Sequence, residues 1–582
     1  MNPRALRITK LAIVLVLFGA NAGSAAAYSL VVIRQGNGDF RHLHWPEGTL
    51  PVSFQLNDQT GPGLANVTDD SDPAGAVNRS LAKWPAVCGV RMTLGSTAVA
   101  DAVVDGINVI TFADTETNRQ IFEMAGSAVG LTLGSFRGET ITETDILFNP
   151  NLTFTTTVDS DEALENADMF DVEGVVTHEL GHSIGLHHSG VESATMWAIA
   201  TVGARSLDPD DIAGARTLYP VGELDGIRGT VRVNGAPAFG AHVVAVADSG
   251  PVFSALTLPD GTYRIDGLDG GSYAVYVEPL DGPHSSVQGG HCVRIGNLTG
   301  AGIYSGATLT TNFSASFFGS AQNPVRVSPA PGDGAPVVDF NLSAGSNTLN
   351  PTLIGPASVN GSSVSGRVDA VALDVDPGTD RFVGVAGPNV DQVDTITAVG
   401  DGVAVDPTSL LVHANAIMGC TEGPLGVAIF KVTVAPDASR GARSLLFFAN
   451  GTVNPLSGAL RVAGEPSTPV PTVTATATTT PENPPTPTPT LTPAPSSTST
   501  PTPTATRTRT RGPTNTPLGP QPCVGDCNHD HAVDTSELVL GAQIILGRRA
   551  MDACPLLDRN NDHVGTIDEL VQAVAASLYG CL

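Results

Sequence analysis

The chain begins its folded part with a run in which apolar and polar residues alternate, from Leu50 to Leu56. This alternation is typical of a half-buried β-strand. Two short apolar runs, Val109–Phe112 and Ile146–Phe148, predict further strands. The N-terminal part therefore contains a sheet.

Two segments of the same region predict helices. The first spans Asp171 to Gly185, because its apolar residues fall near one helical face and Gly185 ends the pattern. The second begins with Asp208 as N-cap and Pro209 at the first helical position, with Asp211 in the first turn. Strands and helices together predict an α+β domain over residues 28–220.

The pattern changes after Gly222. Short β-branched runs alternate with Gly, Asp and Pro up to about Gly464, which predicts two β-sandwich domains, residues 221–345 and 346–465. Residues 466–522 are almost entirely Thr, Pro, Ser and Ala, so they form an extended linker that cannot bury a core. A compact acidic module, residues 523–582, follows.

The first residues have the order of a secretory signal peptide. A basic start is followed by the apolar run Leu11–Ala20 and the small residues Ser24–Ala27. We expect cleavage after Ala27, so that residues 1–27 are removed and the protein is secreted. A membrane anchor is the alternative, but the apolar run is short for a span, and no later run would cross the membrane in the mature chain.

Charge and cysteine content narrow the choice of partners and compartment. The net charge is −28, and a phosphate backbone requires a basic face, so nucleic acid and anionic membranes are excluded as partners. Four of the seven cysteines (Cys523, Cys527, Cys554 and Cys581) lie in the last module. Such a cluster outside the cell forms disulfides, in a pairing that the sequence does not fix.

One motif carries the chemistry. His178 and His182 are one helical turn apart, so both imidazoles project from one face and can bind one Zn²⁺. Gly185 allows the chain to leave the helix with positive φ, which brings His188 round as a third ligand. Three protein ligands leave the fourth position open for water, which is typical of one catalytic zinc.

Glu179 is the candidate catalytic residue. It lies beside the two histidines but is offset around the helix, so it can reach a zinc-bound water without ligating the metal. Zinc lowers the pKa of that water to around 7. Glu179 then takes the proton as general base, a peptide carbonyl is attacked, and Glu179 passes the proton to the leaving amine.

The extended spacing of His178, Glu179, His182, Gly185 and His188 resembles that of the metzincin metallopeptidases, and of the matrixins among them. The resemblance implies that Met196 is the methionine of the turn beneath the zinc, a hydrophobic floor and not a ligand. It also implies that residues 145–149 form the strand beside the substrate, and that residues 210–219 form the closing helix.

The sequence departs from the animal members of this family in two respects. No cysteine stands between Tyr28 and the first strand, and Cys88 lies inside the domain, so we expect no cysteine-switch latency. A His-rich loop for a second, structural zinc is not evident. His187 is a neighbour of the ligand set, since the family spacing selects His188.

The next block resembles a carboxypeptidase regulatory-like domain, a small β-sandwich, over residues 221–345. The Asp260–Gly261 pair between alternating runs predicts a hairpin there. Residues 346–465 resemble an Ig-like sandwich.

The last module carries two stretches of oxygen ligands at the spacing of EF-hand calcium loops. The predicted ligands are Asp526, Asn528, Asp530, Asp534 and Glu537 in the first loop, and Asp558, Asn560, Asp562, Thr566 and Glu569 in the second. An apolar helix-like run follows each loop. We expect two Ca²⁺ ions in a small α-helical module that resembles a type I dockerin.

This resemblance implies a cohesin-like or cell-surface partner for the module. His531 and His563 stand where glycine is usual, and nothing upstream resembles a glycosidase. We therefore favour a calcium-stabilised attachment module.

The sequence predicts a modular, secreted zinc endopeptidase: an α+β metzincin catalytic domain, two β-sandwich domains, a linker and a small α-helical EF-hand module. Its substrates would be extracellular proteins or peptides. The alternative is a surface-attached adhesin or carbohydrate-associated binding protein whose peptidase domain is vestigial.

Overall fold

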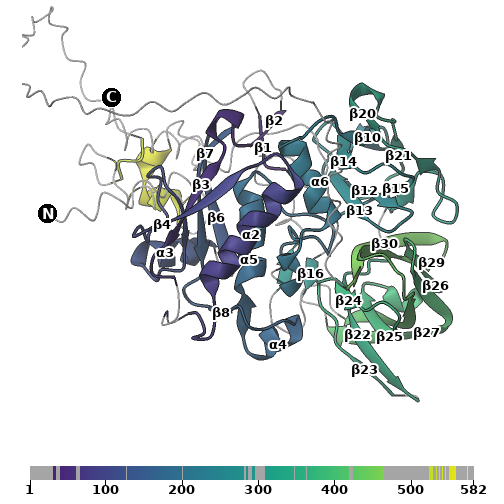
Figure 1. Cartoon of the computed structure of the whole chain (residues 1–582). Coiled ribbons are helices and arrows are strands. Elements are labelled where there is room, and N and C mark those ends of the chain that lie inside the picture. Colours follow the sequence, from purple (N-terminus) through teal and green to yellow (C-terminus); the bar gives the residue numbers. More distant parts are fainter. Residues whose placement is uncertain are drawn as a thin grey trace, which may run out of the picture. The chain divides into compact units, whose positions relative to one another are not determined.

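The computed structural model of the chain forms two compact units, Met1–Ser467 and Thr468–Leu582 (Figure 1). In the first unit it describes residues 30–34, 40–60, 64, 66–125, 128–199, 201–280, 283–285, 292–294, 309–345, 348–361, 363–418 and 424–463. In the second unit it describes residues 524–527, 533, 537, 540–541, 544, 549–558 and 573. The predicted signal peptide and the predicted linker lie outside the described residues.

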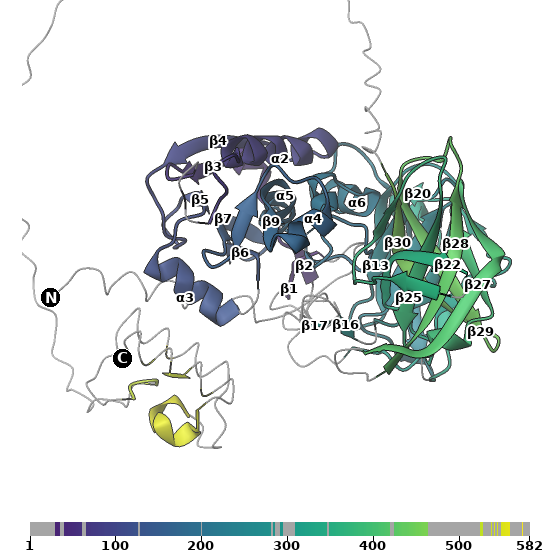
Figure 2. The ribbon, with the colours of Figure 1, turned by 90° about the horizontal axis from the view of Figure 1, so that it is seen from below.

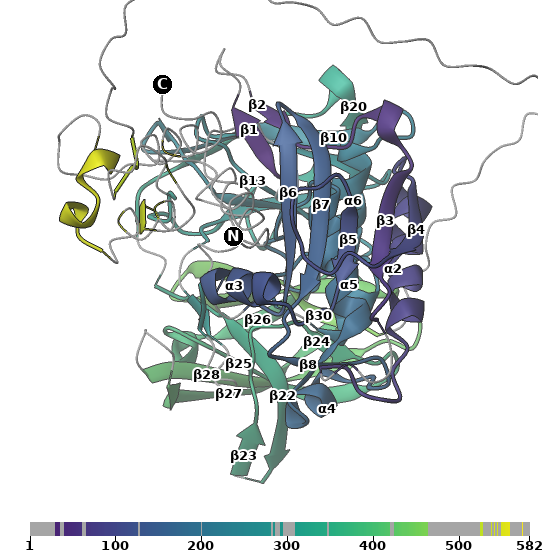
Figure 3. The same cartoon turned by 90° about the vertical axis from the view of Figure 1, so that its left-hand side faces the viewer.

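The N-terminal domain, which we define as the described residues up to Pro220, is built on a five-stranded sheet in the order β4-β3-β5-β7-β6 (Figure 3). Neighbouring strands are parallel except for the edge strand β6, which is antiparallel to β7. The strands are β3 (Val52–Asn57), β4 (Met92–Thr97), β5 (Asn108–Thr111), β6 (Gly130–Arg137) and β7 (Thr140–Phe148). All three predicted strands are present: β3 and β5 lie within two residues of their expected bounds, whereas β7 begins six residues before Ile146.

Helices cover both faces of this sheet. On one face, α2 and α5 pack on Ile110, Phe112, Ile146 and Phe148, and the rings of Phe112 and Phe148 stack with centroids 3.8 Å apart. On the other face α3 covers Leu147 (Figure 2). The helices are α2 (Pro73–Val87), α3 (Glu116–Ala125), α4 (Asp161–Asn166), α5 (Val172–Ser183) and α6 (Pro209–Leu218). The alternation of strand side chains thus separates two cores.

Shorter elements complete the domain: the strand pairs β1 (Val32–Arg34) with β2 (Phe40–His42) and β8 (Thr153–Thr155) with β9 (Met169–Asp171), and the 3₁₀ turns η1 (Glu47–Thr49) and η2 (Val202–Arg205). The chain around β1 and β2 lies against the end of α5. The Val31 amide donates to the Gly185 carbonyl at 2.8 Å, and the Trp45 indole donates to the Ser183 carbonyl at 2.8 Å.

The first sheet domain, Asp225–Leu342, has two principal sheets. One joins β10 (Asp225–Val233), β11 (Ala236–Pro237), β14 (Thr262–Leu268), β20 (Ala330–Pro331) and β21 (Phe340–Leu342). The other joins β12 (His242–Ala247), β13 (Val252–Leu256), β15 (Tyr273–Glu278), β18 (Ser316–Phe317) and β19 (Arg326–Val327). The remaining elements are the pair β16 (Pro283–Ser285) and β17 (Cys292–Arg294) and the turn η4 (Gly332–Gly334).

The hairpin predicted at Asp260–Gly261 is wrong in its pairing. The turn exists, because Gly261 has φ +80° and its amide donates to the Leu258 carbonyl at 2.8 Å. The strands on either side, β13 and β14, pair in different sheets. The turn therefore carries the chain from one sheet to the other. Tertiary packing decides which strands pair, and the local sequence does not report it.

The second sheet domain, Leu353–Val462, also has two sheets (Figure 1). One has the order β23-β22-β25-β28-β27 and the other β24-β30-β29-β26. The elements are β22 (Leu353–Asn360), β23 (Ser363–Gly366), β24 (Leu373–Val375), β25 (Asp380–Gly387), η5 (Val390–Gln392), β26 (Thr395–Val399), β27 (Val403–Met418), β28 (Pro424–Val434), β29 (Gly441–Ala449) and β30 (Thr452–Val462). Phe430 and Phe447 meet in the core between the two sheets, with ring centroids 6.3 Å apart.

The molecule is thus multidomain and rich in strands, with few helices. One hydrophobic cluster includes Leu218 and Tyr219 of the N-terminal domain together with Ile227 and Ile265 of the first sheet domain. The predicted boundaries between the domains stay predictions. No helix in the described part of the chain is both long and apolar enough to cross a membrane.

In the C-terminal unit the described elements are the turns η6 (Met551–Ala553) and η7 (Pro555–Leu557). A disulfide joins Cys527 to Cys554, which selects one pair from the predicted cluster. The carboxylate residues Asp526, Glu537 and Asp558 are buried. The other seven predicted calcium ligands lie outside the described residues: Asn528, Asp530, Asp534, Asn560, Asp562, Thr566 and Glu569.

Candidate metal centre

The helix that carries the metal-binding motif, α5, is fixed at its first turn. Asp171 is its N-cap, and Oδ2 accepts a hydrogen bond from the Gly174 amide at 2.6 Å. The same carboxylate is bound by two nitrogens of Arg205, at 2.9 and 2.6 Å. The carboxylate of Asp171 therefore binds both the first turn of α5 and the Arg205 guanidinium of η2, and these charge-assisted hydrogen bonds hold the start of α5 against η2.

The helix ends where Gly185 adopts φ +104°. The Gly185 amide donates to the His182 carbonyl and the Leu186 amide to the Gly181 carbonyl, each at 3.0 Å, which is the Schellman pattern. A Cβ at Gly185 would collide with the Leu43 carbonyl oxygen. The predicted stop is therefore present, and it turns the chain toward His188.

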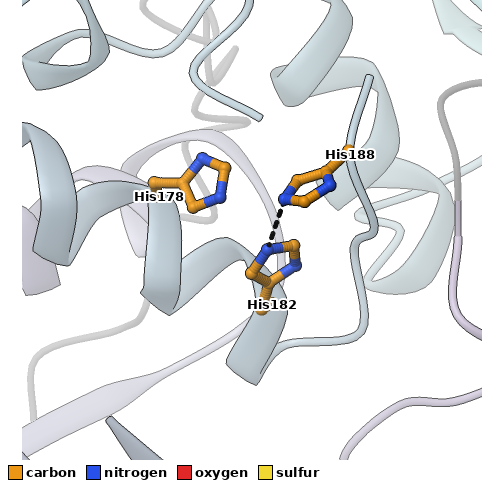
Figure 4. Close-up of side chains that lie close together, drawn as sticks. All are labelled: His178, His182 and His188. Atoms are coloured by element: carbon orange, nitrogen blue, oxygen red, sulfur yellow. Dashed lines mark hydrogen bonds between the residues drawn. The ribbon is translucent and has the colours of Figure 1, made fainter. Parts of the chain in front are cut away.

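Three imidazoles meet beside this turn (Figure 4). One ligand atom from each of His178, His182 and His188 can be chosen so that all three lie within 4.8 Å of one another. The ring centroids are 4.7 to 5.2 Å apart. The structure thus brings together the three residues that the sequence predicts as zinc ligands.

Hydrogen bonds to the backbone orient two of these rings. Nδ1 of His178 lies 2.7 Å from the Thr195 carbonyl oxygen, and Nδ1 of His182 lies 2.9 Å from the Leu186 carbonyl oxygen. A carbonyl can only accept, so each Nδ1 carries the proton and each Nε2 keeps its lone pair. This is the tautomer that a metal-binding histidine needs.

The spacing of the nitrogens fits zinc. Nε2 of His182 lies 3.3 Å from Nε2 of His188. Two nitrogens that are each about 2.05 Å from a tetrahedral zinc lie ~3.4 Å apart. Since His182 Nε2 carries no proton, it is the acceptor in this contact, and its distance from His188 Nε2 suits two ligands of one ion.

Burial keeps the imidazoles of His178 and His182 neutral. It lowers the pKa of His178 to about 3, with His182 adding to the effect, and it lowers the pKa of His182 as well. Neutral imidazole is the form that binds a metal, so protons do not compete for the site at neutral pH.

Glu179 is buried next to this cluster. Its Oε2 accepts a hydrogen bond from the Thr132 hydroxyl on β6 at 2.8 Å. A Cβ at Gly130 would lie 2.8 Å from Oε1, so β6 approaches the carboxylate closely because residue 130 has no side chain. Burial raises the pKa of Glu179 to about 7, against the hydrogen bond from Thr132, which lowers it.

Met196 packs against α5 at Gly181. It is 2% exposed, and a Cβ at Gly181 would collide with its sulfur. The Met196 amide donates to Asp211 Oδ1 at 3.0 Å and the Thr195 amide to Asp211 Oδ2 at 2.7 Å. Asp211 also completes the capping box of α6 that begins at Asp208. One carboxylate therefore fixes both the turn that carries Met196 and the start of α6.

Two other residues with potential ligand atoms, His187 and Cys88, are not part of the three-histidine cluster. His187 Nδ1 accepts a hydrogen bond from the His188 amide at 2.7 Å, and this imidazole is not in the three-histidine cluster. Cys88 is a buried free thiol whose pKa burial raises to about 11, so it is a poor metal ligand.

Residues that the sequence analysis missed are those that hold the site from a distance. Thr132 and Gly130 have no signal of their own, since they lie on another element far from Glu179 in sequence. The sequence places Asp211 in the first turn after the Asp208 cap, and its role in a capping box could have been predicted from that position.

Comparison with known proteins places this geometry in a family context. Residues 52–220 match the Matrixin family model. Metalloendoproteinase 2-MMP from Arabidopsis thaliana is 26% identical over 144 residues, which are 24% of this chain and 35% of that protein. The hatching enzyme of Paracentrotus lividus is 47% identical over 60 residues, 10% of each chain. These likenesses support a matrixin-type zinc metalloendopeptidase domain in the N-terminal part.

The likenesses are confined to that part. The chain spans about a third of the length of the Arabidopsis protein and a tenth of the hatching enzyme. Fervidolysin from Fervidobacterium pennivorans, whose crystal structure shares 12% identity over 42% of this chain and 33% of its own, gives a TM-score of 0.13, which carries no argument about the fold.

Proposed function

We propose that the chain is a secreted, zinc-dependent endopeptidase that hydrolyses peptide bonds of extracellular proteins. The observation that carries the proposal is the convergence of His178, His182 and His188, with their ligand atoms within 4.8 Å of one another. The match of residues 52–220 to the matrixins supports the same reading.

The zinc site and Glu179 have separate roles in the proposed reaction. Zinc held by the three imidazoles would lower the pKa of a water molecule to about 7 and polarise the carbonyl of a bound peptide. Glu179 follows His178 in the helix, so its side chain is offset from the three ligands. With a pKa of about 7, its carboxylate accepts a proton near neutral pH and returns it to the leaving amine.

A digestion experiment tests the proposal. The full chain, purified and loaded with zinc, should cleave casein or gelatin, lose this activity with a chelator of transition metals, and regain it when zinc is added back. His178→Ala should lose both zinc and cleavage. A wild-type protein that holds zinc yet cleaves no protein, while binding a glycan, would favour the adhesin alternative.

Secretion is part of the proposal and rests on residues 1–27. Expression of the full gene product in a secreting host should place the protein in the medium, with a mature N-terminus at Tyr28. Retention in the cell with an intact N-terminus would contradict this part alone.

We propose further that the C-terminal unit binds two calcium ions and attaches the enzyme to a cohesin-like or cell-surface partner. The spacing of the ten oxygen ligands along the sequence supports this. Calorimetric titration of the chelator-treated full chain with Ca²⁺ should show two sites, and Glu537→Gln should lose one. Heat that is unchanged by this substitution would contradict the assignment.

A further inference from the structure

The segment that follows the third histidine, Ser189–Arg205, is held by residues far away in the sequence. It carries the turn with Met196 and the 3₁₀ turn η2, and it connects His188 to α6. Most of its residues up to Trp197 are buried, although the stretch from Ser189 to Trp197 contains no helix or strand. The two sheet domains supply much of what buries it.

Strand β30 of the second sheet domain contacts the segment at its middle. The Glu192 amide donates to the Ser457 carbonyl at 3.0 Å. The next residue, Gly458, has φ +72°, and a Cβ there would lie 2.5 Å from Val191 Cγ1 and 3.0 Å from Ser193 Oγ. The segment therefore rests directly on the backbone of β30.

The same domain contacts the segment again further along. The Trp197 indole donates to the Ala370 carbonyl at 2.8 Å, and the indole is 2% exposed. The Arg461 guanidinium lies against Gly203 in η2 and is anchored by two hydrogen bonds to Asp374, at 2.6 and 2.9 Å. Both ends of the stretch from Trp197 to η2 thus have a partner in the second sheet domain.

The first sheet domain adds a link close to the zinc ligand. The Ser254 amide of β13 donates to Asp210 Oδ1 at 2.7 Å, and the Ser189 hydroxyl donates to Asp210 Oδ2 at 2.6 Å. All three residues are buried. A strand of the first sheet domain is therefore connected through one carboxylate to the residue next to His188.

We propose that the second sheet domain supports peptidase activity by holding the segment Ser189–Arg205 in place. Through Ser457, Gly458 and Arg461 it fixes Ser189–Arg205, and it thereby sets the position of His188 and of the Thr195 carbonyl that orients His178. These residues of β30 are positioning residues, because they act through the segment and do not touch the metal ligands. The effects on catalysis and on zinc release rest on the proposed function, whereas the effect on the segment does not.

Two glycines of the same β-strand and its preceding turn allow a matched test in the full chain. Gly458→Ala and Gly451→Ala both place an alanine at positive φ, +72° and +78°, so they share the same backbone cost. Only Gly458→Ala presses on the segment, since a Cβ at 451 meets nothing within 4 Å. We expect kcat/KM of Gly458→Ala to fall by about tenfold or more, mainly in kcat, because small misplacements of catalytic groups are costly. Gly451→Ala should stay near wild type.

Two measurements decide the inference without relying on activity. Amide hydrogen exchange of residues 189–197 should become faster in Gly458→Ala and not in Gly451→Ala, and zinc should pass to a competing chelator faster in the first variant only. Equal exchange and equal zinc release in the two variants would overturn the inference, whether or not the wild type cleaves protein. If wild type holds zinc but cleaves nothing, the proposed function fails while these two measurements still stand.

A second pair of variants covers the case in which Gly458→Ala does not fold. Arg461→Gln removes the guanidinium from Gly203, and Lys431→Gln removes an exposed ion pair with Asp380 on the other sheet of the same domain. Exchange of residues 201–206 should rise in the first variant alone. An unchanged exchange pattern in Arg461→Gln would contradict the role given to β30.

Discussion

The carboxylate of Asp211 accepts a hydrogen bond from the Thr195 amide at 2.7 Å, and the carbonyl oxygen of this same Thr195 lies 2.7 Å from Nδ1 of His178. Thr195 therefore connects α6, through Asp211, to the imidazole of His178. A hydrogen bond from the imidazole Nδ1 to a backbone carbonyl fixes both the orientation and the tautomer of the ring.

Asp211→Asn should weaken this connection. The amide replaces one accepting oxygen with a donor, yet both oxygens of Asp211 face backbone amides, of Thr195, Met196 and Asp208. We expect the free energy of unfolding to fall by about 1–3 kcal/mol, the cost of leaving a buried donor without its acceptor. Chemical denaturation measures it, and zinc release to a chelator should be faster.

Asp72→Asn is the matched control for that change. Asp72 is the exposed N-cap of α2 and accepts from the Gly75 amide at 2.9 Å. Asparagine caps a helix about as well as aspartate, so its effect should be within ~0.5 kcal/mol. Equal losses in the two variants would show that Asp211 has no special role.

Thr132→Val should move the pH dependence of cleavage. The Thr132 hydroxyl lowers the pKa of Glu179, so its removal raises that pKa further. A general base acts only when deprotonated, so the acidic limb of the kcat/KM profile should shift to higher pH, by about one unit for the loss of one hydrogen bond to a charged group. Thr132→Ser keeps the hydroxyl and should keep the wild-type limb. A Thr132→Val profile that overlays the wild-type profile would show that Thr132 does not control the pKa of Glu179.

Asp145→Asn should change how stability depends on pH. Burial raises the pKa of Asp145 in the folded protein from its ordinary value of 3.8 to about 8, although its Oδ1 accepts a hydrogen bond from the Val109 amide. The folded state therefore holds a proton that the unfolded chain loses first. The stability that this group contributes is complete below the unfolded pKa and is lost as pH rises toward the folded pKa.

Urea denaturation at several pH values between 5 and 8 measures this effect. These values lie between the ordinary pKa of an aspartate, 3.8, and the raised pKa of Asp145 in the folded protein, about 8. Relative to wild type, Asp145→Asn should gain up to ~1.4 kcal/mol per pH unit across this window. A constant offset for Asp145→Asn would contradict the argument.

What the sequence could predict follows from how local each interaction is. The three histidines were predictable because a helical turn and a glycine with positive φ place them, all within one short segment. Asp208 and Pro209 were predictable for the same reason, as caps depend on neighbouring residues.

The rest depends on tertiary packing. Thr132 reaches Glu179 from another element, and Ser457 reaches Glu192 from another domain. The turn at Gly261 shows the limit most clearly, because its local geometry is as predicted while its strands pair in different sheets. Nothing in the local pattern reports which strand lies beside which.

We infer that the three imidazoles hold a zinc ion beside a carboxylate, that of Glu179, which moves the proton. The most direct test is Glu179→Gln in the full chain, with zinc content and cleavage of a peptide substrate measured on the same sample. We predict that the variant keeps one zinc per chain while kcat/KM falls by at least about 100-fold, the contribution of a positioned general base. A variant that keeps its zinc and cleaves as fast as wild type would contradict the account.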